Sequence, residues 1–147
     1  MSPEAFRFLH RLRVRWAEVD MQRVVFNANY LLYFDVASTE YFRAAVGGDP
    51  VGLKAIFDHL YVVKSTVEYH RPACFDDALE VGVRTEAMGR SSIRLGFAIF
   101  RGTERLVSGE NIYVYAVAGS SQAIPEDFRH MIEALEQLPA PMSPEQT

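Results

Sequence analysis

Apolar residues recur at three- and four-residue steps over residues 30–45. They are Tyr30, Leu31, Phe34, Ala37, Tyr41 and Ala45. This spacing places the apolar side chains on one side of a helix. Glycine and proline follow at residues 47–50, and both residue types interrupt a helical pattern. The segment therefore predicts one long helix that ends near Ala45.

Two asparagines, Asn27 and Asn29, stand where this helix should begin. Asparagine is among the best N-cap residues, because its side-chain oxygen accepts a hydrogen bond from an orphan backbone N–H. An isolated carboxylate, Asp20, lies a few residues earlier. Free N–H groups and the helix dipole at such a terminus favour developing negative charge. A carboxylate facing this end of a helix is the skeleton of an acyl-transfer site.

Most of the remaining chain alternates between apolar and polar residues, which is the period of a strand with one buried face. Turn residues such as Pro72, Gly89 and Gly102 divide the alternating part. The expected strands are 6–17, 61–70, 79–87, 93–99 and 106–117, and two further helices are expected at 51–59 and 125–138. One long apolar helix beside a mostly antiparallel sheet predicts an α+β domain, in which a curved sheet of about five strands wraps around the helix.

Length and cysteine content indicate one domain. A chain of 147 residues can bury a sufficient core without disulfides or a metal. The single cysteine, Cys74, has no partner for an internal disulfide or a structural zinc site. We expect one domain over residues 1–147, with its core at about residues 7–138 and a mobile tail at residues 139–147.

Charge and hydropathy argue against two classes of partner. The formal charge of −4 is spread along the chain, and no basic tract is present that would neutralise the phosphates of a nucleic acid. No apolar run reaches the length needed to span a membrane. The N-terminal residues lack the apolar core of a secretory signal. We therefore expect a cytoplasmic protein that binds no nucleic acid.

Residues 13–45 resemble the signature of the hotdog-fold acyl-CoA thioesterases. The likeness is greatest to the 4-hydroxybenzoyl-CoA thioesterase branch that includes the Tol-Pal-associated enzymes. That signature has a strand, a turn with a catalytic aspartate, a short connector and a helix. The matching residues are Asp20, Val24, Val25, Phe26, Asn29, Tyr30, Tyr33, Phe34, Ala37, Ser38, Thr39, Glu40 and Arg43. Weaker likenesses at residues 62–77 and 89–92 extend the resemblance over about residues 7–130.

The resemblance implies a hotdog fold and hydrolysis of a thioester to a free acid and a thiol. It assigns Asp20 as nucleophile or general base, and the backbone N–H of Asn27 as the donor that polarises the thioester carbonyl. It implies homodimers that often pair into tetramers, with the site between subunits. No metal or tightly bound cofactor is expected, because coenzyme A is part of the substrate. The residues implied in substrate binding are Val25, Phe26, Asn29, Tyr30, Arg90, Ser91 and Ser92.

Two positions depart from the family pattern. Arg23 occupies a connector position that is usually glycine, and Asn27 stands where many Tol-Pal-associated members have histidine. These departures leave two other functions open, an acyl-carrier-protein thioesterase of a biosynthetic pathway and a non-catalytic acyl-CoA-binding module. Asp20 can also be a turn residue of purely structural use. Asn27 and Asn29 can be helix caps and nothing more. The sequence does not indicate the acyl group.

Overall fold

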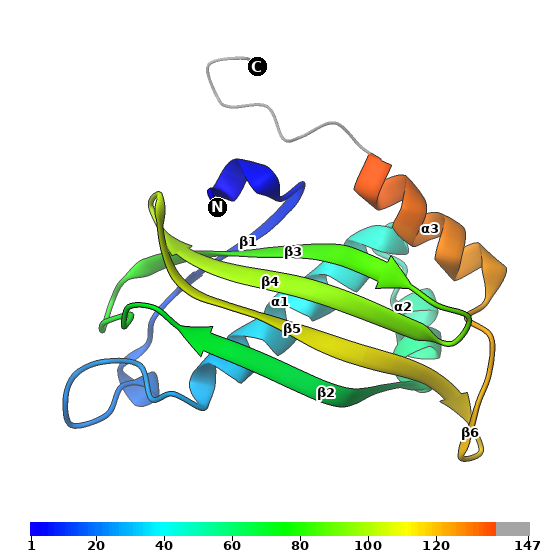
Figure 1. Cartoon of the computed structure of the whole chain (residues 1–147), viewed down its shortest axis with the longest axis horizontal. Coiled ribbons are helices and arrows are strands. Elements are labelled where there is room, and N and C mark those ends of the chain that lie inside the picture. Colours follow the sequence, from blue (N-terminus) through cyan, green and yellow to red (C-terminus); the bar gives the residue numbers. More distant parts are fainter. Residues whose placement is uncertain (138–147) are drawn as a thin grey trace.

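A curved antiparallel sheet forms most of the structure, a computed structural model that describes residues 1–137 (Figure 1). Its strands run in the spatial order β1-β3-β4-β5-β2, with the short β6 beside β5. The strands are β1 (Phe8–Arg13), β2 (Leu60–Tyr69), β3 (Ala78–Met88), β4 (Ser92–Arg101), β5 (Glu104–Val117) and β6 (Ser120–Ser121). The helices are α1 (Asn29–Ala45), α2 (Pro50–Phe57) and α3 (Glu126–Gln137), with short 3-10 turns at Pro3–Ala5 and Trp16–Glu18.

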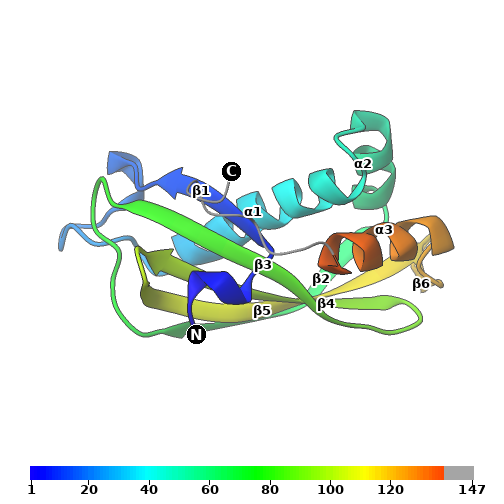
Figure 2. The ribbon, with the colours of Figure 1, turned by 90° about the horizontal axis from the view of Figure 1, so that it is seen from above.

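Helix α1 supplies the centre of the hydrophobic core and lies against one face of the sheet (Figure 2). Its buried side chains recur at helical spacing, and they are Tyr30, Tyr33, Phe34, Ala37, Ser38, Tyr41 and Phe42. The Phe34 ring stacks on the Phe97 ring of β4 at a centroid distance of 4.4 Å. Burial of aromatic side chains of this size accounts for much of the stability of a domain. The expected long central helix is therefore confirmed.

A glycine in β5 allows α1 to approach the sheet closely. A Cβ atom built on Gly109 would lie 2.3 Å from the Thr66 backbone oxygen and 2.8 Å from the Phe34 ring. No real side chain tolerates such distances, so a larger residue here would push the helix and β2 away from β5. Gly109 thus fixes how deeply the helix sits in the curved sheet.

The N-terminal strand is shorter than the alternating pattern predicts. The expectation of a strand over residues 6–17 is wrong at both ends, because β1 pairs with β3 only over Phe8–Arg13. Phe6 instead packs on the sheet face opposite α1, over Gly82 and beside Phe100. At the other end, Val14 exchanges backbone hydrogen bonds with residues 76 and 77, after which the chain turns into Trp16–Glu18. Contacts distant in the sequence therefore end this strand.

The remaining elements agree with the sequence patterns to within a few residues. The α+β class and the curved sheet of about five long strands are confirmed, and only the two-residue β6 was not expected. Helix α2 begins earlier than expected, at Pro50, because the Asp49 side chain accepts a hydrogen bond from the Val51 N–H. The predicted mobile tail at residues 139–147 lies outside the described residues. No helix among the described residues is long and apolar enough to cross a membrane.

Candidate active site

The loop between Glu18 and α1 carries Asp20 in a tight turn. Val19 and Val25 form an antiparallel bridge at the base of this loop. Within it, the Asp20 N–H donates to the Val24 carbonyl at 3.0 Å, and the Arg23 N–H donates to the Asp20 carbonyl at 2.9 Å. The Asp20 carboxylate is exposed and accepts one hydrogen bond, from the Gln22 N–H at 2.8 Å. The turn therefore holds the carboxylate in place and leaves most of its acceptor capacity open.

Arg23 adopts a backbone conformation that side chains rarely tolerate. Its φ is 65°, in the left-handed region where glycine is the usual residue. This explains why a glycine is expected at this point of the connector. The chain keeps the turn with arginine and therefore carries local backbone strain beside the candidate catalytic aspartate.

We expect the Arg23→Gly variant to be more stable than the native chain by about 0.5–1 kcal/mol. The left-handed conformation costs an arginine about 1–2 kcal/mol, and the greater freedom of glycine in the unfolded chain offsets about 0.4–1 kcal/mol of the relief. Urea unfolding measures the change. Gln22→Gly is the matched control, because Gln22 is the adjacent turn residue and has no positive φ. Stabilisation by both variants, or by neither, would contradict this account.

Helix α1 begins without the side-chain cap that the asparagines predict. The capping position is Ala28, which has helical angles and no side-chain cap, so the assignment of Asn27 or Asn29 as N-cap is wrong. The Asn29 amide instead donates to the Glu18 carbonyl at 2.9 Å and ties the helix to the preceding turn. Among the described residues, no acceptor receives a hydrogen bond from the Asn27 N–H. This N–H is therefore a free donor at the positive end of a helix.

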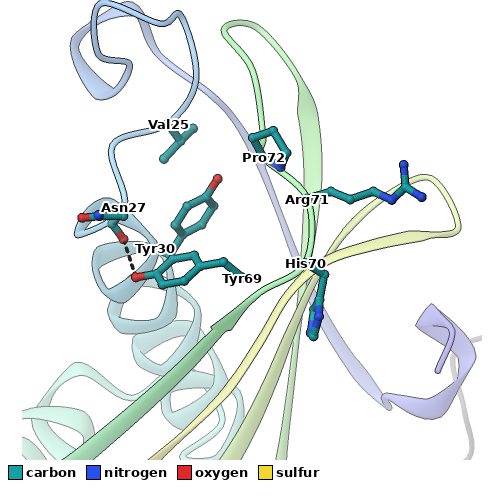
Figure 3. Close-up of a pocket in the computed structure, with 7 residues that line it drawn as sticks. All are labelled: Val25, Asn27, Tyr30, Tyr69, His70, Arg71 and Pro72. Atoms are coloured by element: carbon teal, nitrogen blue, oxygen red, sulfur yellow. Dashed lines mark hydrogen bonds between the residues drawn. The ribbon is translucent and has the colours of Figure 1, made fainter.

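A pocket of about 340 Å³ opens beside the start of α1 (Figure 3). It is lined by Val25, Asn27, Tyr30, Tyr69, His70, Arg71 and Pro72. The Tyr69 hydroxyl donates to the Asn27 carbonyl at 3.1 Å. The rings of Tyr30 and Tyr69 meet edge to face at 5.6 Å. Burial raises the pKa of the Tyr30 hydroxyl, so this hydroxyl stays neutral at physiological pH. The pocket is thus mainly apolar, with an N–H donor at its rim.

Only some of the residues predicted for the site lie around this pocket. Val25, Asn27 and Tyr30 line it, whereas Asp20, Phe26 and Asn29 do not. Phe26 is exposed. The turn with Arg90, Ser91 and Ser92 joins β3 to β4 at the end of the sheet opposite the start of α1 (Figure 1). Its backbone bonds there to Tyr115 and Ile124. A single chain therefore does not bring this turn to the pocket.

Glu18 supports the start of α1, a role that the sequence patterns did not reveal. Its side chain is only 8% exposed. One carboxylate oxygen accepts from the Arg15 N–H at 2.8 Å and the Tyr33 hydroxyl at 3.0 Å, and the other from the Arg15 guanidinium at 2.8 Å. Burial alone would raise the pKa of Glu18, but the hydrogen bonds from Arg15 and Tyr33 outweigh it and lower this pKa. The indication of this role in the sequence is the position of Glu18, two residues before Asp20.

The pocket and the separate Asp20 turn together supply groups that suit thioester chemistry. An exposed carboxylate can attack a carbonyl or activate water, and a free N–H at a helix terminus can stabilise the oxyanion that results. Within residues 1–137, no three histidine, cysteine, aspartate or glutamate side chains gather as they would around a metal ion.

Comparison with known proteins connects this geometry to one family. Residues 22–108 match the family model of the thioesterase superfamily, a match that begins just after Asp20. The acyl-CoA thioester hydrolase YbgC of Escherichia coli O6:H1 is 33% identical over 111 residues, which cover 76% of this chain and 75% of the relative. A Thermus thermophilus thioesterase, solved with coenzyme A and zinc, is 33% identical with a TM-score of 0.80 and covers 91% of this chain and 97% of that one. The PA5185 protein of Pseudomonas aeruginosa strain PAO1 is 26% identical, with a TM-score of 0.79 over 92% of this chain and 95% of that one.

The family match spans more than half of the chain and includes α1, the pocket and most of the sheet. The related structures share nearly the whole fold, in which a curved sheet encloses the long helix. Family, fold and site chemistry therefore agree, and the chain belongs to the thioesterase superfamily, has the hotdog fold and is a thioester hydrolase.

Proposed function

We propose that this chain is an acyl-CoA thioesterase of the 4-hydroxybenzoyl-CoA and Tol-Pal-associated branch. The reaction adds water across the acyl–sulfur bond and releases a free acid and coenzyme A. Asp20 acts either as the nucleophile that attacks the carbonyl carbon or as the base that takes a proton from the attacking water. The Asn27 N–H donates to the carbonyl oxygen as negative charge develops there.

The observation that carries this proposal is the free N–H of Asn27. Asn27 lies two residues before a 17-residue helix and lines the pocket, where the helix dipole adds to the effect of its N–H. One donor of this kind can contribute about 3 kcal/mol to transition-state stabilisation. The Asp20 turn is joined to the pocket through Val25, which bridges to Val19 and lines the cavity.

The substrate's acyl group fits the apolar side of the pocket. Val25, Tyr30 and Tyr69 supply apolar and aromatic surface there, and Phe26 and Asn29 flank the entry into α1. Coenzyme A enters as part of the substrate, so the proposed reaction needs no metal and no bound cofactor. The lone cysteine is consistent with the reducing cytoplasm that we propose as its location.

We propose further that the protein is a homo-oligomer, a dimer that pairs again into a tetramer. Strand β2 is an unpaired edge of the sheet and exposes Tyr61, Val62 and Val63. An exposed apolar edge strand is covered most simply by a second copy. Antiparallel pairing of two β2 strands reverses one copy relative to the other. The turn 90–92 of the second copy then approaches the end of the sheet where α1 begins, and its arginine suits the phosphates of coenzyme A.

We expect the Val63→Asp variant to have a smaller mass in solution than the native protein and to lose most of its activity. A carboxylate on the paired edge would be buried beside its symmetry mate, which is unfavourable. Sedimentation equilibrium measures the mass, and thiol release measures the activity. Val51→Asp is the matched control, because Val51 is also exposed but belongs to α2 and not to a strand. If the native protein is a fully active monomer, the site is not shared between subunits.

The function itself is tested with a panel of thioesters. We expect the native protein to release thiol from acyl-CoA esters, and the panel ranks aromatic, short and medium acyl groups. The same acyl groups on acyl carrier protein form the second arm, because exposed Arg23 makes no ion pair among the described residues and could contact an acidic carrier. Faster hydrolysis of the esters on acyl carrier protein would identify the carrier-protein thioester, and not the coenzyme A ester, as the substrate. Tight acyl-CoA binding without hydrolysis of either type of ester would indicate a non-catalytic acyl-CoA-binding module.

A further inference from the structure

The segment at residues 70–77, which joins β2 to β3, contacts the pocket, the first turn of α1 and the Asp20 loop. His70, Arg71 and Pro72 form one wall of the pocket. The Ala73 N–H donates to the Tyr30 hydroxyl at 3.0 Å, and the Ala73 carbonyl accepts from the Val25 N–H at 2.9 Å. Next along the chain, Cys74 bridges to Val24 in the Asp20 loop. The position of this connector therefore sets the position of the pocket wall, the first turn of α1 and the Asp20 loop together.

Backbone hydrogen bonds hold the two ends of the connector to Leu106 and Val14, and one arginine adds side-chain bonds. Arg101, at the end of β4, donates to the Asp77 carboxylate at 2.7 Å and to the Glu104 carboxylate at 2.6 Å. The same guanidinium reaches the Pro72 carbonyl at 3.4 Å. Arg101 thus holds residues near both ends of the connector, one of which forms part of the pocket wall.

The two carboxylates that bind Arg101 also contact other residues of the connector. The Asp77 oxygen that Arg101 contacts also accepts the Cys74 N–H at 2.8 Å, which closes the connector on itself. Glu104 lies 3.5 Å from the Arg71 guanidinium, so it connects the pocket wall to the same network. The hydrogen bonds that Asp77 and Glu104 accept from Arg101 raise the pKa of its guanidinium. A planar guanidinium carries five N–H donors in a fixed fork, so it reaches two carboxylates and a carbonyl in different directions, whereas a lysine has three donors on one nitrogen.

Asp77 therefore has an assignable role in holding the connector. Its side chain is 21% exposed and that of Arg101 35% exposed, so the pair is partly shielded from water. The neighbouring Asp76 faces Arg13 at 3.6 Å, and both of those side chains are more than 60% exposed. Of these two ion pairs, the Asp77 pair is the one placed to restrain the connector.

We infer that Arg101 is a positioning residue for thioester hydrolysis, and that it acts through Asp77 and Pro72 to hold the pocket wall against the first turn of α1. The inference rests on the proposed active site at that helix terminus. Displacement of a pocket wall by about 1 Å can cost about a hundredfold in rate, and this guanidinium joins the end of β4 directly to the connector.

The test compares Arg101→Met, Arg101→Lys and Asp77→Asn with the native protein by steady-state hydrolysis of the best acyl-CoA ester. We expect kcat/KM to fall about tenfold or more for Arg101→Met and Asp77→Asn, with less loss for Arg101→Lys, which keeps the charge. The double variant Arg101→Met with Asp77→Asn should be no worse than either single variant, because both substitutions remove one interaction. Additive losses would overturn the inference.

Arg84→Met is the matched control. Arg84 also contacts a carboxylate, Glu86 at 2.8 Å, and a backbone carbonyl, that of Ala5 at 3.3 Å, and it is similarly exposed. It holds the N-terminal turn and not the connector. We expect native kcat and KM for this variant, and an equal loss in both arginine variants would overturn the positioning role in favour of general stabilisation.

A second measurement keeps this inference separate from the proposed function. The only tryptophan, Trp16, packs against Phe75 of the connector at a ring-centroid distance of 5.0 Å. Its indole NMR signal should shift in Arg101→Met and Asp77→Asn and not in Arg84→Met, without any substrate. If the native protein hydrolyses no thioester, the proposed function fails while this shift still reports the anchor. An unshifted signal with native kinetics in Arg101→Met would overturn the anchor and leave the function standing.

Discussion

The Asp20→Asn variant is expected to fold as the native chain does and to lose about a hundredfold or more in the rate of thioester hydrolysis. Asparagine has the same shape, and its side-chain oxygen can still accept the Gln22 N–H that holds the turn. An amide can neither attack the carbonyl nor take a proton from water, and general base catalysis alone contributes about 10²–10⁴. Released thiol is measured for both proteins at saturating substrate, with circular dichroism to verify folding.

Asp76→Asn is the control for this measurement. Asp76 is also an exposed aspartate in a turn, with a positive φ and an exposed ion pair to Arg13, and it does not line the pocket. We expect a native rate for it. A native rate for Asp20→Asn would remove Asp20 from the mechanism. Equal, feeble rates in the native chain and Asp20→Asn would indicate a carrier-protein substrate or a binding role.

Much of the fold follows from local patterns in the sequence. The helical spacing from Tyr30 to Ala45 predicts α1 almost to its last residue, because most of this face is buried. Alternation predicts β2 to β5 to within a few residues, although most side chains of β2 are exposed. Glu40 and Arg43, which are three residues apart on α1, form an ion pair at 3.1 Å.

The departures arise where contacts distant in the sequence decide the outcome. Phe6 continues the alternating pattern of β1 but packs on the other face of the sheet, because Gly82 leaves room there. Asn29 is a good cap by type, yet its amide is used to bind the Glu18 carbonyl, eleven residues away. The connector at residues 70–77 carries no helix or strand pattern, so its contacts with Tyr30 and Val25 become visible only in the folded chain.

Some residues of the candidate site can likewise be predicted from the sequence, and others cannot. Asp20 and Asn27 stand out in the sequence because they flank the start of one helix. Tyr69, His70 and Pro72 do not stand out, since they reach the pocket from a strand end some forty residues later. Glu18 was hidden because a charged residue is expected on the surface, whereas this one is buried with its acceptors satisfied by Arg15 and Tyr33.

The second large effect is expected at Glu18. We expect Glu18→Gln to lower the free energy of unfolding by about 2 kcal/mol at pH 7, because a buried charged acceptor loses hydrogen bonds of about 1.5–3 kcal/mol. The new amide group would also direct donors at the Arg15 guanidinium. Glu40→Gln is the control, because its ion pair with Arg43 is well exposed, and surface pairs contribute about 0.2–1 kcal/mol. Chemical denaturation measures both, and equal losses would contradict the prediction.

The Glu18 effect should also depend on pH in a defined direction. Because the pKa of Glu18 is lowered in the folded chain from an ordinary value of 4.5, the unfolded chain takes up the proton first as the pH falls. The stabilisation is therefore complete above about pH 4.5 and disappears as the pH drops through the folded pKa, where native protein and Glu18→Gln converge. Tyr33→Phe removes one donor to the carboxylate, so the pKa of Glu18 in the folded variant should lie closer to its ordinary value. Its loss of stability in acid should therefore be smaller, and should end at a higher pH, than in the native protein. A difference between native protein and Glu18→Gln that stays constant down to pH 2 would mean that the carboxylate charge is not what holds the Asp20 loop to α1.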